Sequence, residues 1–252
     1  MIAPAPRGSR RRISIASGRG RFASALLGIS LFSFSVPAAA QVGTVVSIFS
    51  DERFRGVSVS DGRPVGILDL SYDASDGIYG AVSASVVATR SEGLRSLGVS
   101  LNGGYAKRLN PGLTADIGVV HSRFSHYSAL SPGRSYTEVY AGLSGRNFGG
   151  RISVSPDYLG AAHWTVHGEL NGHVDLTKRL LLDGEIGLLA PLGRAAFETR
   201  LRAQLDGRVG LAQRLGRLTL HAAVTSTSGG LEIYTGKGHA RTALIVGISC
   251  AL

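Results

Sequence analysis

Fourteen residues, AHWTVHGELNGHVD from Ala162 to Asp175, alternate without a break between apolar or small side chains at even positions and polar ones at odd positions. Because successive side chains of a β-strand point to opposite faces, this pattern indicates a strand with one apolar and one polar face. A membrane-spanning strand needs about 9–11 residues, whereas strands of soluble proteins average about 5–6. The length of the run favours a membrane β-barrel, and a soluble β protein is the alternative.

The same period of two recurs along the chain. Odd positions are mainly apolar from Leu97 to Tyr105, from Leu113 to Val119 and from Phe197 to Leu211. Short turns such as Asn110 to Gly112 alternate with longer loops, which is typical of outer-membrane barrels. We expect strands at 42–50, 64–72, 78–89, 95–107, 113–124, 135–144, 148–155, 162–175, 180–189, 197–212, 217–227 and 241–251. The sequence therefore predicts an all-β fold, an antiparallel up-and-down transmembrane β-barrel of about 12 strands.

Two features of the predicted strand ends fit a membrane barrel. Aromatic residues near the ends of the runs supply part of an aromatic girdle: Tyr72, Tyr79, Tyr105, Tyr127, Tyr136, Tyr140, Tyr158 and Trp164. Alternate residues from Leu244 to Leu252 form one apolar stripe that includes Cys250. This stripe resembles the terminal-strand signal of outer-membrane barrels, which usually closes with an aromatic residue where this chain has Leu252.

The first forty residues have the pattern of a secretory signal peptide. Six arginines precede a 15-residue apolar run, Phe22 to Val36, and Pro37 to Ala40 provides a small-residue cleavage site. We therefore expect residues 1–40 to be a signal peptide and residues 41–252 to be the barrel. The whole chain has 252 residues and a formal charge of +10. Without the signal the charge is +4, from 21 basic and 17 acidic residues, which removes the main support for a nucleic-acid partner.

The stretch DERFRGVSVSDGRP, Asp51 to Pro64, resembles the opening motif of the TorF-type porins, also called the Gcw_chp family. The motif positions are Asp51, Arg53, Phe54, Arg55, Gly56, Ser60, Asp61 and Gly62. Gly77 to Ala81, Tyr136 to Gly142 and Ser155 to Tyr158 resemble later segments of the family. The resemblance implies an outer-membrane β-barrel of Gram-negative bacteria with a pore function.

The charges of the opening motif have two interpretations. If the motif is extended, Arg53 and Arg55 share strand parity with Asp51, about 6.6 Å between neighbours on one face. They then form either a salt-bridged cluster that packs the barrel end or lumen, or a charged constriction that selects ions. Gly56 and Gly62 permit turns.

Polar faces of the strands are expected to line the lumen, since an Arg or Lys facing lipid at mid-depth costs about 2–4 kcal/mol. The predicted pore-lining residues are Asp116, Glu138, His163, His167, Glu169, His173, Asp183, Glu185, Glu198, Arg200, Arg202, Asp206 and Arg208. These charges can produce a field across an open pore, or they can pair and plug a narrow one. Along a strand His163 and His167 lie ~13 Å apart, too far to share one ion, so we expect no metal site.

The favoured function is a porin-like channel for passive diffusion of small hydrophilic solutes or ions. The alternatives are a non-conducting structural or adhesive barrel and an outer-membrane barrel enzyme. The sequence has no G-x-S-x-G or H-E-x-x-H motif, and pairs such as His221 with Ser226 or His121 with Ser122 can arise by chance. We therefore expect no enzyme and no cofactor. Expected partners are outer-membrane lipid and, during biogenesis, the barrel-insertion machinery; oligomeric state stays open, and the expected location is the outer membrane after export.

Overall fold

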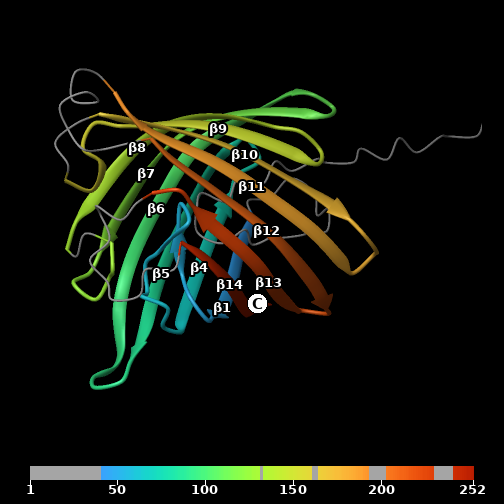
Figure 1. The fold of residues 1–252 in the computed structure, drawn as a ribbon. Helices are drawn as coiled ribbons and strands as arrows, with labels where there is room; N and C mark the ends of the chain where they lie inside the picture. The colour runs from blue at the N-terminus through green and yellow to red at the C-terminus, as the bar shows by residue number, and fades with distance from the viewer. Residues whose placement is uncertain (1–40, 131–132, 161–163, 193–202, 230–240) are drawn as a thin grey trace, which may run out of the picture.

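Twelve long antiparallel strands close into a barrel in the computed structural model, which describes residues 41–130, 133–160, 164–192, 203–229 and 241–252 (Figure 1). The barrel strands are β1 (Gln41–Phe49), β4 (Val65–Asp73), β5 (Ile78–Thr89), β6 (Gly93–Asn110), β7 (Leu113–Phe124), β8 (Ser135–Ser144), β9 (Phe148–Ser155), β10 (Thr165–Asp175), β11 (Leu180–Pro191), β12 (Gln204–Leu215), β13 (Leu218–Thr227) and β14 (Thr242–Ala251). Each pairs with its neighbours along the chain, and β1 pairs with β14. This confirms the predicted fold.

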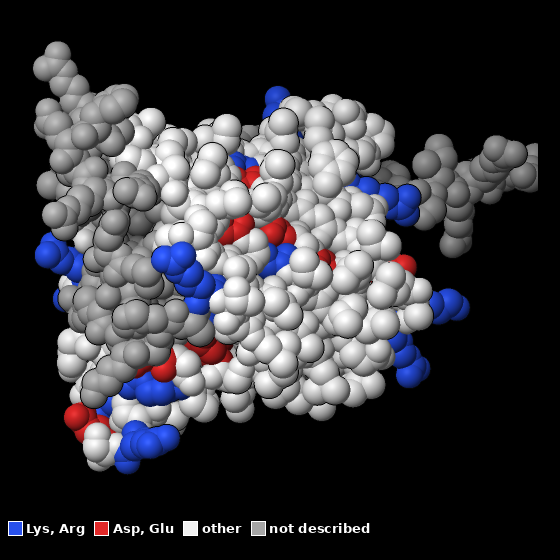
Figure 2. Space-filling view, viewed as in Figure 1, with Lys and Arg blue, Asp and Glu red and all other residues white. Residues whose placement is uncertain are grey.

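The outside of the barrel is apolar and the inside is polar. On β10 the outward Leu170 is 64% exposed, whereas the next residue back, Glu169, faces inward and is 7% exposed. Each of the twelve strands carries exposed large hydrophobic side chains. Most of the described surface in Figure 2 is uncharged, with most Lys and Arg side chains at its periphery. Such a continuous apolar surface is expected of a protein that has lipid as its outer solvent.

The connections differ between the two ends of the barrel. At the end that holds the start of β1 and the end of β14, the links are short, at residues 74–77, 111–112, 145–147, 176–179 and 216–217. The opposite end holds the longer links, including residues 50–64 and 125–134. None of the helices in the described parts of the chain is long and apolar enough to cross a membrane.

The seam where the sheet closes has the shortest strand pairing. β1 pairs with β14 over five residue pairs, from Val45 opposite Ala251 to Phe49 opposite Gly247, whereas β1 pairs with β4 over nine. One backbone hydrogen bond extends the seam at each end, from Ser50 to Val246 and from Leu252 to Thr44. The fewest ladder contacts of the barrel therefore lie between its first and last strands.

The long link after β1 folds into the barrel as a hairpin instead of standing above it. Its strands are β2 (Arg53–Phe54) and β3 (Val57–Ser58), and residues 51–60 are all buried. Arg55 and Gly56 form the two-residue turn with φ of 51° and 75°, the left-handed geometry that suits a tight hairpin. The extended arrangement expected for Asp51, Arg53 and Arg55 is therefore wrong, because the chain reverses at Arg55.

A β-bulge in β6 corrects the expected alternation there. The register between β5 and β6 shifts at Ser85, which lies opposite Gly98 while Val86 lies opposite Ser96. The extra residue, Leu97, turns inward and is 0% exposed, whereas Val99 and Leu101 face outward as expected. A bulge inserts one residue into one strand, so the parity of the side chains changes at that point.

The tyrosines do not all join an outer girdle. Tyr72, Tyr105 and Trp164 are exposed on the outside, as expected, but Tyr136, Tyr140 and Tyr158 are buried. The predicted signal peptide, residues 1–40, lies outside the described residues and stays a prediction. The predicted strands 162–175 and 197–212 are described from residues 164 and 203 onward, where β10 starts at Thr165 and β12 starts at Gln204 and continues to Leu215.

Candidate functional site in the barrel interior

Four charged residues and two glycines, one residue from each of six neighbouring strands, form a row on the inner wall. The backbone register places one residue from each of β7 to β12 in a single row: Asp116, Gly142, Arg151, Glu169, Gly187 and Asp206. The four charged members of this row are buried. We call it the interior charge row; it presents three carboxylates and one guanidinium to the lumen.

The two glycines of the interior charge row leave space for their charged neighbours. A Cβ at Gly142 would lie 2.4 Å from Oδ1 of Asp116. A Cβ at Gly187 would lie 2.8 Å from Nε2 of His167 and 2.9 Å from both carboxylate oxygens of Asp206. Because real Cβ atoms do not approach other atoms so closely, both positions need glycine for these side chains to lie flat over the wall.

Arginines inside the barrel are matched with individual carboxylates. Arg151 Nη2 lies 3.6 Å from Asp116 Oδ2, and Arg208 forms an ion pair with Asp183. Within the described part of the chain no ion pair reaches Glu169, Glu185 or Asp206. Glu169 and Asp206 flank Gly187, and Glu185 is two residues from Gly187 on the same face of β11. The wall formed by β10, β11 and β12 therefore carries three carboxyl groups that have no ion pair among the described residues.

Asp51 organises the hairpin that enters the lumen. Its Oδ1 accepts hydrogen bonds from the hydroxyls of Ser58 and Ser60, at 2.6 and 2.7 Å, and from the backbone N–H of Gly62. Its Oδ2 accepts from Arg53 Nε at 2.9 Å. The acid, arginine, serines and glycine of this motif are thus one buried carboxylate and its donors, and the salt-bridged-cluster interpretation fits the Asp51–Arg53 pair.

Arg55 at the hairpin tip joins the two sides of the interior. Its Nη2 donates to both oxygens of Glu138 on β8, at 2.7 and 2.8 Å. Its carbonyl accepts a hydrogen bond from Gln204 on β12. The guanidinium also lies 5.0 Å from the ring centroid of Tyr158, a distance at which cation–π attraction acts. The tip is therefore fixed to walls that lie far apart in the sheet.

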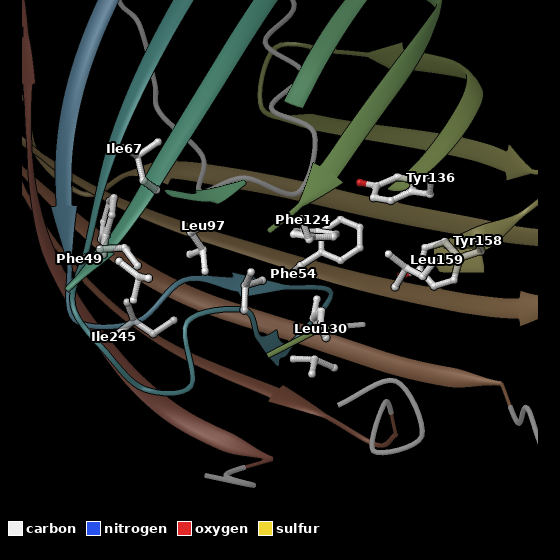
Figure 3. Close-up of a cluster of buried hydrophobic side chains, with 14 of the residues drawn as sticks. Phe49, Phe54, Ile67, Leu97, Phe124, Leu130, Tyr136, Tyr158, Leu159 and Ile245 are labelled. Carbon is white, nitrogen blue, oxygen red and sulfur yellow. The ribbon is translucent and has the colours of Figure 1, made fainter. Parts of the chain in front are cut away.

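Apolar side chains complete the attachment of the hairpin. Phe54 lies among the rings of Phe124, Tyr136 and Tyr158, with centroids 5.4 to 6.4 Å away (Figure 3). The bulged Leu97 belongs to the same buried cluster. The inward Leu97 side chain thus supplies apolar surface where the hairpin docks. The lumen is therefore partly filled at its loop end, the end of the barrel that holds the longer links.

Glu52 is the hairpin group with the most unusual environment. The side chain is 1% exposed, and its Oε2 has no hydrogen-bond partner. Burial raises the pKa of the Glu52 carboxyl to about 7, because a charged carboxylate loses its hydration there; Asp69 and Asp51 add to the rise. The position therefore favours a neutral carboxylic acid below neutral pH.

Most predicted pore-lining residues lie on the inner wall. Those placed there are Asp116, Glu138, His167, Glu169, His173, Asp183, Glu185, Asp206 and Arg208. His163, Glu198, Arg200 and Arg202 lie outside the described residues. The structure brings Glu169, Glu185 and Asp206 together and places His173 opposite Asp183 in the register of β10 and β11. That these residues line a conducting pore stays a prediction.

Arg151, Tyr79 and Tyr140 are among the interior residues that were missed in the sequence. Arg151 shares parity with the inward Ser153 and Ser155 of β9, so alternation could have found it. The hydroxyls of Tyr79 and Tyr140 contact each other. The Tyr79 hydroxyl donates to Asp116, and the Tyr140 hydroxyl donates to Asn102. Tyr140 has the same parity as Glu138, which was the available signal for its inward direction.

The structure bears on two chemical alternatives, a metal site and a catalytic Ser–His pair. The described residues contain no group of three or more His, Cys, Asp or Glu with metal-binding geometry. His221 does pair with a serine, but the partner is Ser249 at 3.0 Å and not Ser226, which bonds Thr242 instead. His121 bonds Thr137 on the exposed side rather than Ser122. Neither of the two Ser–His pairs considered in the sequence therefore forms.

The chain is similar to one protein family and to solved barrel structures. The family described as "Bacterial protein of unknown function (Gcw_chp)" matches residues 36–247. A NanC porin structure superposes with a TM-score of 0.57 at 11% identity, over 84% of this chain and 100% of the porin. A KdgM porin superposes with a TM-score of 0.51 at 11% identity, over 83% of this chain and 99% of the porin. No curated protein matches the chain.

Proposed function

The chain belongs to the Gcw_chp family, and from that premise we propose that it is an outer-membrane channel for passive diffusion of small hydrophilic solutes or ions. The observation that carries the proposal is the closed twelve-strand barrel with an apolar exterior and a charged interior. Lipid can cover the outside, while charged groups inside replace the water that a permeating solute loses. The barrel shape shared with NanC and KdgM, both called porins, supports the same proposal.

The inward hairpin sets the size class of the solute. It starts from β1 and reaches β8 through Glu138 and β12 through Gln204, so it crosses the interior. A solute has to pass beside Arg55 and the wall of β10 to β12. Twelve strands enclose an interior between those of filled eight-stranded and open sixteen-stranded barrels. The proposal is therefore a narrow channel for small solutes, with the Arg55–Glu138 pair at its constriction.

Planar-bilayer recording of the purified protein tests the proposal. Step currents are expected, and Glu185→Lys should shift the reversal potential in a salt gradient towards anions, because Glu185 lies on the inner wall. Asp76→Lys makes the same charge change in an exposed turn and should leave the reversal potential unchanged. An absence of current at all salt concentrations would contradict the channel.

The hairpin also favours a second candidate, the non-conducting structural or adhesive barrel. Its apolar cluster fills part of the loop end, and if no gap remains beside it the barrel is closed. The bilayer recording separates the two candidates. For the enzyme alternative the specific observation is the Ser249–His221 hydrogen bond, although within the described residues no carboxylate hydrogen-bonds to this histidine. A lipid-hydrolysis assay with Ser249→Ala tests it, and we expect no turnover in either protein.

Location and biogenesis follow from the same proposal. We expect export by the N-terminal signal and insertion by the barrel-insertion machinery, which reads the last strand. β14 presents Leu244, Val246 and Ile248 on its outer face. Fusion of residues 1–40 to a reporter enzyme should direct it to the periplasm, and retention in the cytoplasm would contradict the signal assignment.

A further inference from the structure

We propose that the inner wall at Gly187 is a binding subsite for the ammonium or guanidinium group of a small organic cation. The subsite consists of His167 and Glu169 on β10 and Asp206 on β12, with Gly187 of β11 as its floor. The inference rests on the proposed channel function, because the lumen is how a solute reaches the wall. It goes further in naming the charge class of the solute and the residues that recognise it.

Two polar groups without partners converge on one point of this wall. His167 Nε2 and both oxygens of Asp206 lie within 2.9 Å of the position that a Cβ of Gly187 would occupy. The two side chains are 3% and 5% exposed, yet among the described residues nothing hydrogen-bonds to His167 Nε2 or Asp206 Oδ2. Buried polar atoms of this kind are nearly always bonded, so two beside each other indicate the place of a missing donor.

The local charge selects a cation. Arg55 pairs with Glu138, Arg151 with Asp116, and Arg208 with Asp183. Glu169, Glu185 and Asp206 are left as additional carboxylates on the same wall, and the neutral amide of Asn171 is the only described group whose hydrogen bond reaches Glu169. A cation would stabilise the ionised form of these carboxyl groups, whereas an anion would be repelled by it.

The acceptor atoms of the subsite suit a ligand with N–H donors. A neutral His167 accepts at Nε2 when its proton is on Nδ1, and the Asp206 carboxylate only accepts. One N–H group between them can satisfy both, and an ammonium has three donors and a guanidinium five. The described residues offer no set of three ligands for a metal ion, which favours an organic cation over a bare metal. Hydrogen bonds between charged partners are the strong class, so the subsite can slow a passing cation.

Isothermal titration calorimetry of the whole protein in detergent micelles tests the subsite, with 1,4-diaminobutane as the cationic probe and glutarate as the anionic one. Saturable heat is expected for the diamine and none for glutarate. Asp206→Asn should weaken diamine binding about tenfold or more, because it removes a charged acceptor. Glu169→Gln should weaken it less. Asp175→Asn, the same charge change at the exposed end of β10, should leave the affinity unchanged.

The outcomes separate this inference from the channel proposal. No diamine binding to the wild type, or equal binding by Asp206→Asn, overturns the subsite even if the protein conducts. Diamine binding that depends on Asp206 in a protein without current supports the subsite and overturns the channel. If Asp206→Asn does not fold, Gly187→Ala and Glu169→Gln provide the test, since the added methyl displaces His167 and Asp206.

Discussion

Removing the charge of Arg55 should release the hairpin from the lumen. Arg55 and Glu138 are both buried, and one guanidinium nitrogen contacts both carboxylate oxygens at 2.7 and 2.8 Å. Arg55→Met keeps most of the apolar stem but leaves Glu138 as an unpaired buried charge. Breaking a buried pair in this way costs about 3–5 kcal/mol, which raises the population of the open hairpin roughly a hundredfold or more.

Trypsin digestion of the folded barrel, read by mass spectrometry, measures this opening. Cleavage after Arg53 requires the hairpin to leave the interior, and its rate follows the open population when reclosing is fast. The double variant Arg55→Met with Glu138→Gln should recover most of the loss, since no unpaired charge remains. Arg95→Met breaks the exposed Arg95–Glu92 pair and should change little. Equal cleavage of Arg55→Met and wild type would refute the assigned role of the buried pair.

Three further predictions concern the same region. The raised pKa of Glu52 means that hairpin stability is full below its unfolded value of about 4.5 and is lost as pH rises through about 7, by about 3 kcal/mol in total. Because trypsin itself works faster as the pH rises, the measurement is the ratio of hairpin cleavage in wild type to that in Glu52→Gln; this ratio should increase over the range, and a flat ratio would contradict the assignment. Gly56→Val places a Cβ 2.8 Å from Cβ of Thr227, whereas Gly62 also has a positive φ but open space around it. Gly56→Val should therefore speed hairpin cleavage more than Gly62→Ala, and equal effects would show that backbone strain alone, and not the close contact, destabilises the hairpin. Leu97→Ala should lower the unfolding free energy by about 2–5 kcal/mol in urea denaturation, because it empties a packed interior site, and a cost no larger than that of the outward Leu101→Ala would argue against the inward bulge.

Alternation of side chains was enough to predict the barrel because each strand repeats its own pattern locally. The expected ranges for β5, β7, β8 and β9 agree with the structure at both ends. The same reasoning failed at Leu97, the extra residue of the bulge in β6. A bulge reverses the direction of a side chain, but the apolar residues of the stretch look the same in the sequence with or without it.

The interior site was only partly predictable. Parity correctly directed His167, Glu169 and Asp206 inward, and residues 51–64 were marked by their motif. The partners of the hairpin could not be predicted, because Arg55 meets Glu138 and Gln204, which are 83 and 149 positions away in the chain. No local pattern encodes such contacts. The tyrosine assignments failed for a related reason: a phenol can serve a membrane interface or a buried network, and the neighbours decide which.

The short seam between β1 and β14 gives the hairpin a part in folding and closure. The hairpin follows β1 directly, and its contacts include residues on β7, β8, β12 and β13. It can dock only after those strands have curled round to face it, so its insertion belongs to the last stage of assembly, when the most distant contacts form. The docked hairpin holds β1 in place from inside the barrel. Separating β1 from β14 at the five residue pairs of the seam therefore also requires breaking the contacts of the hairpin.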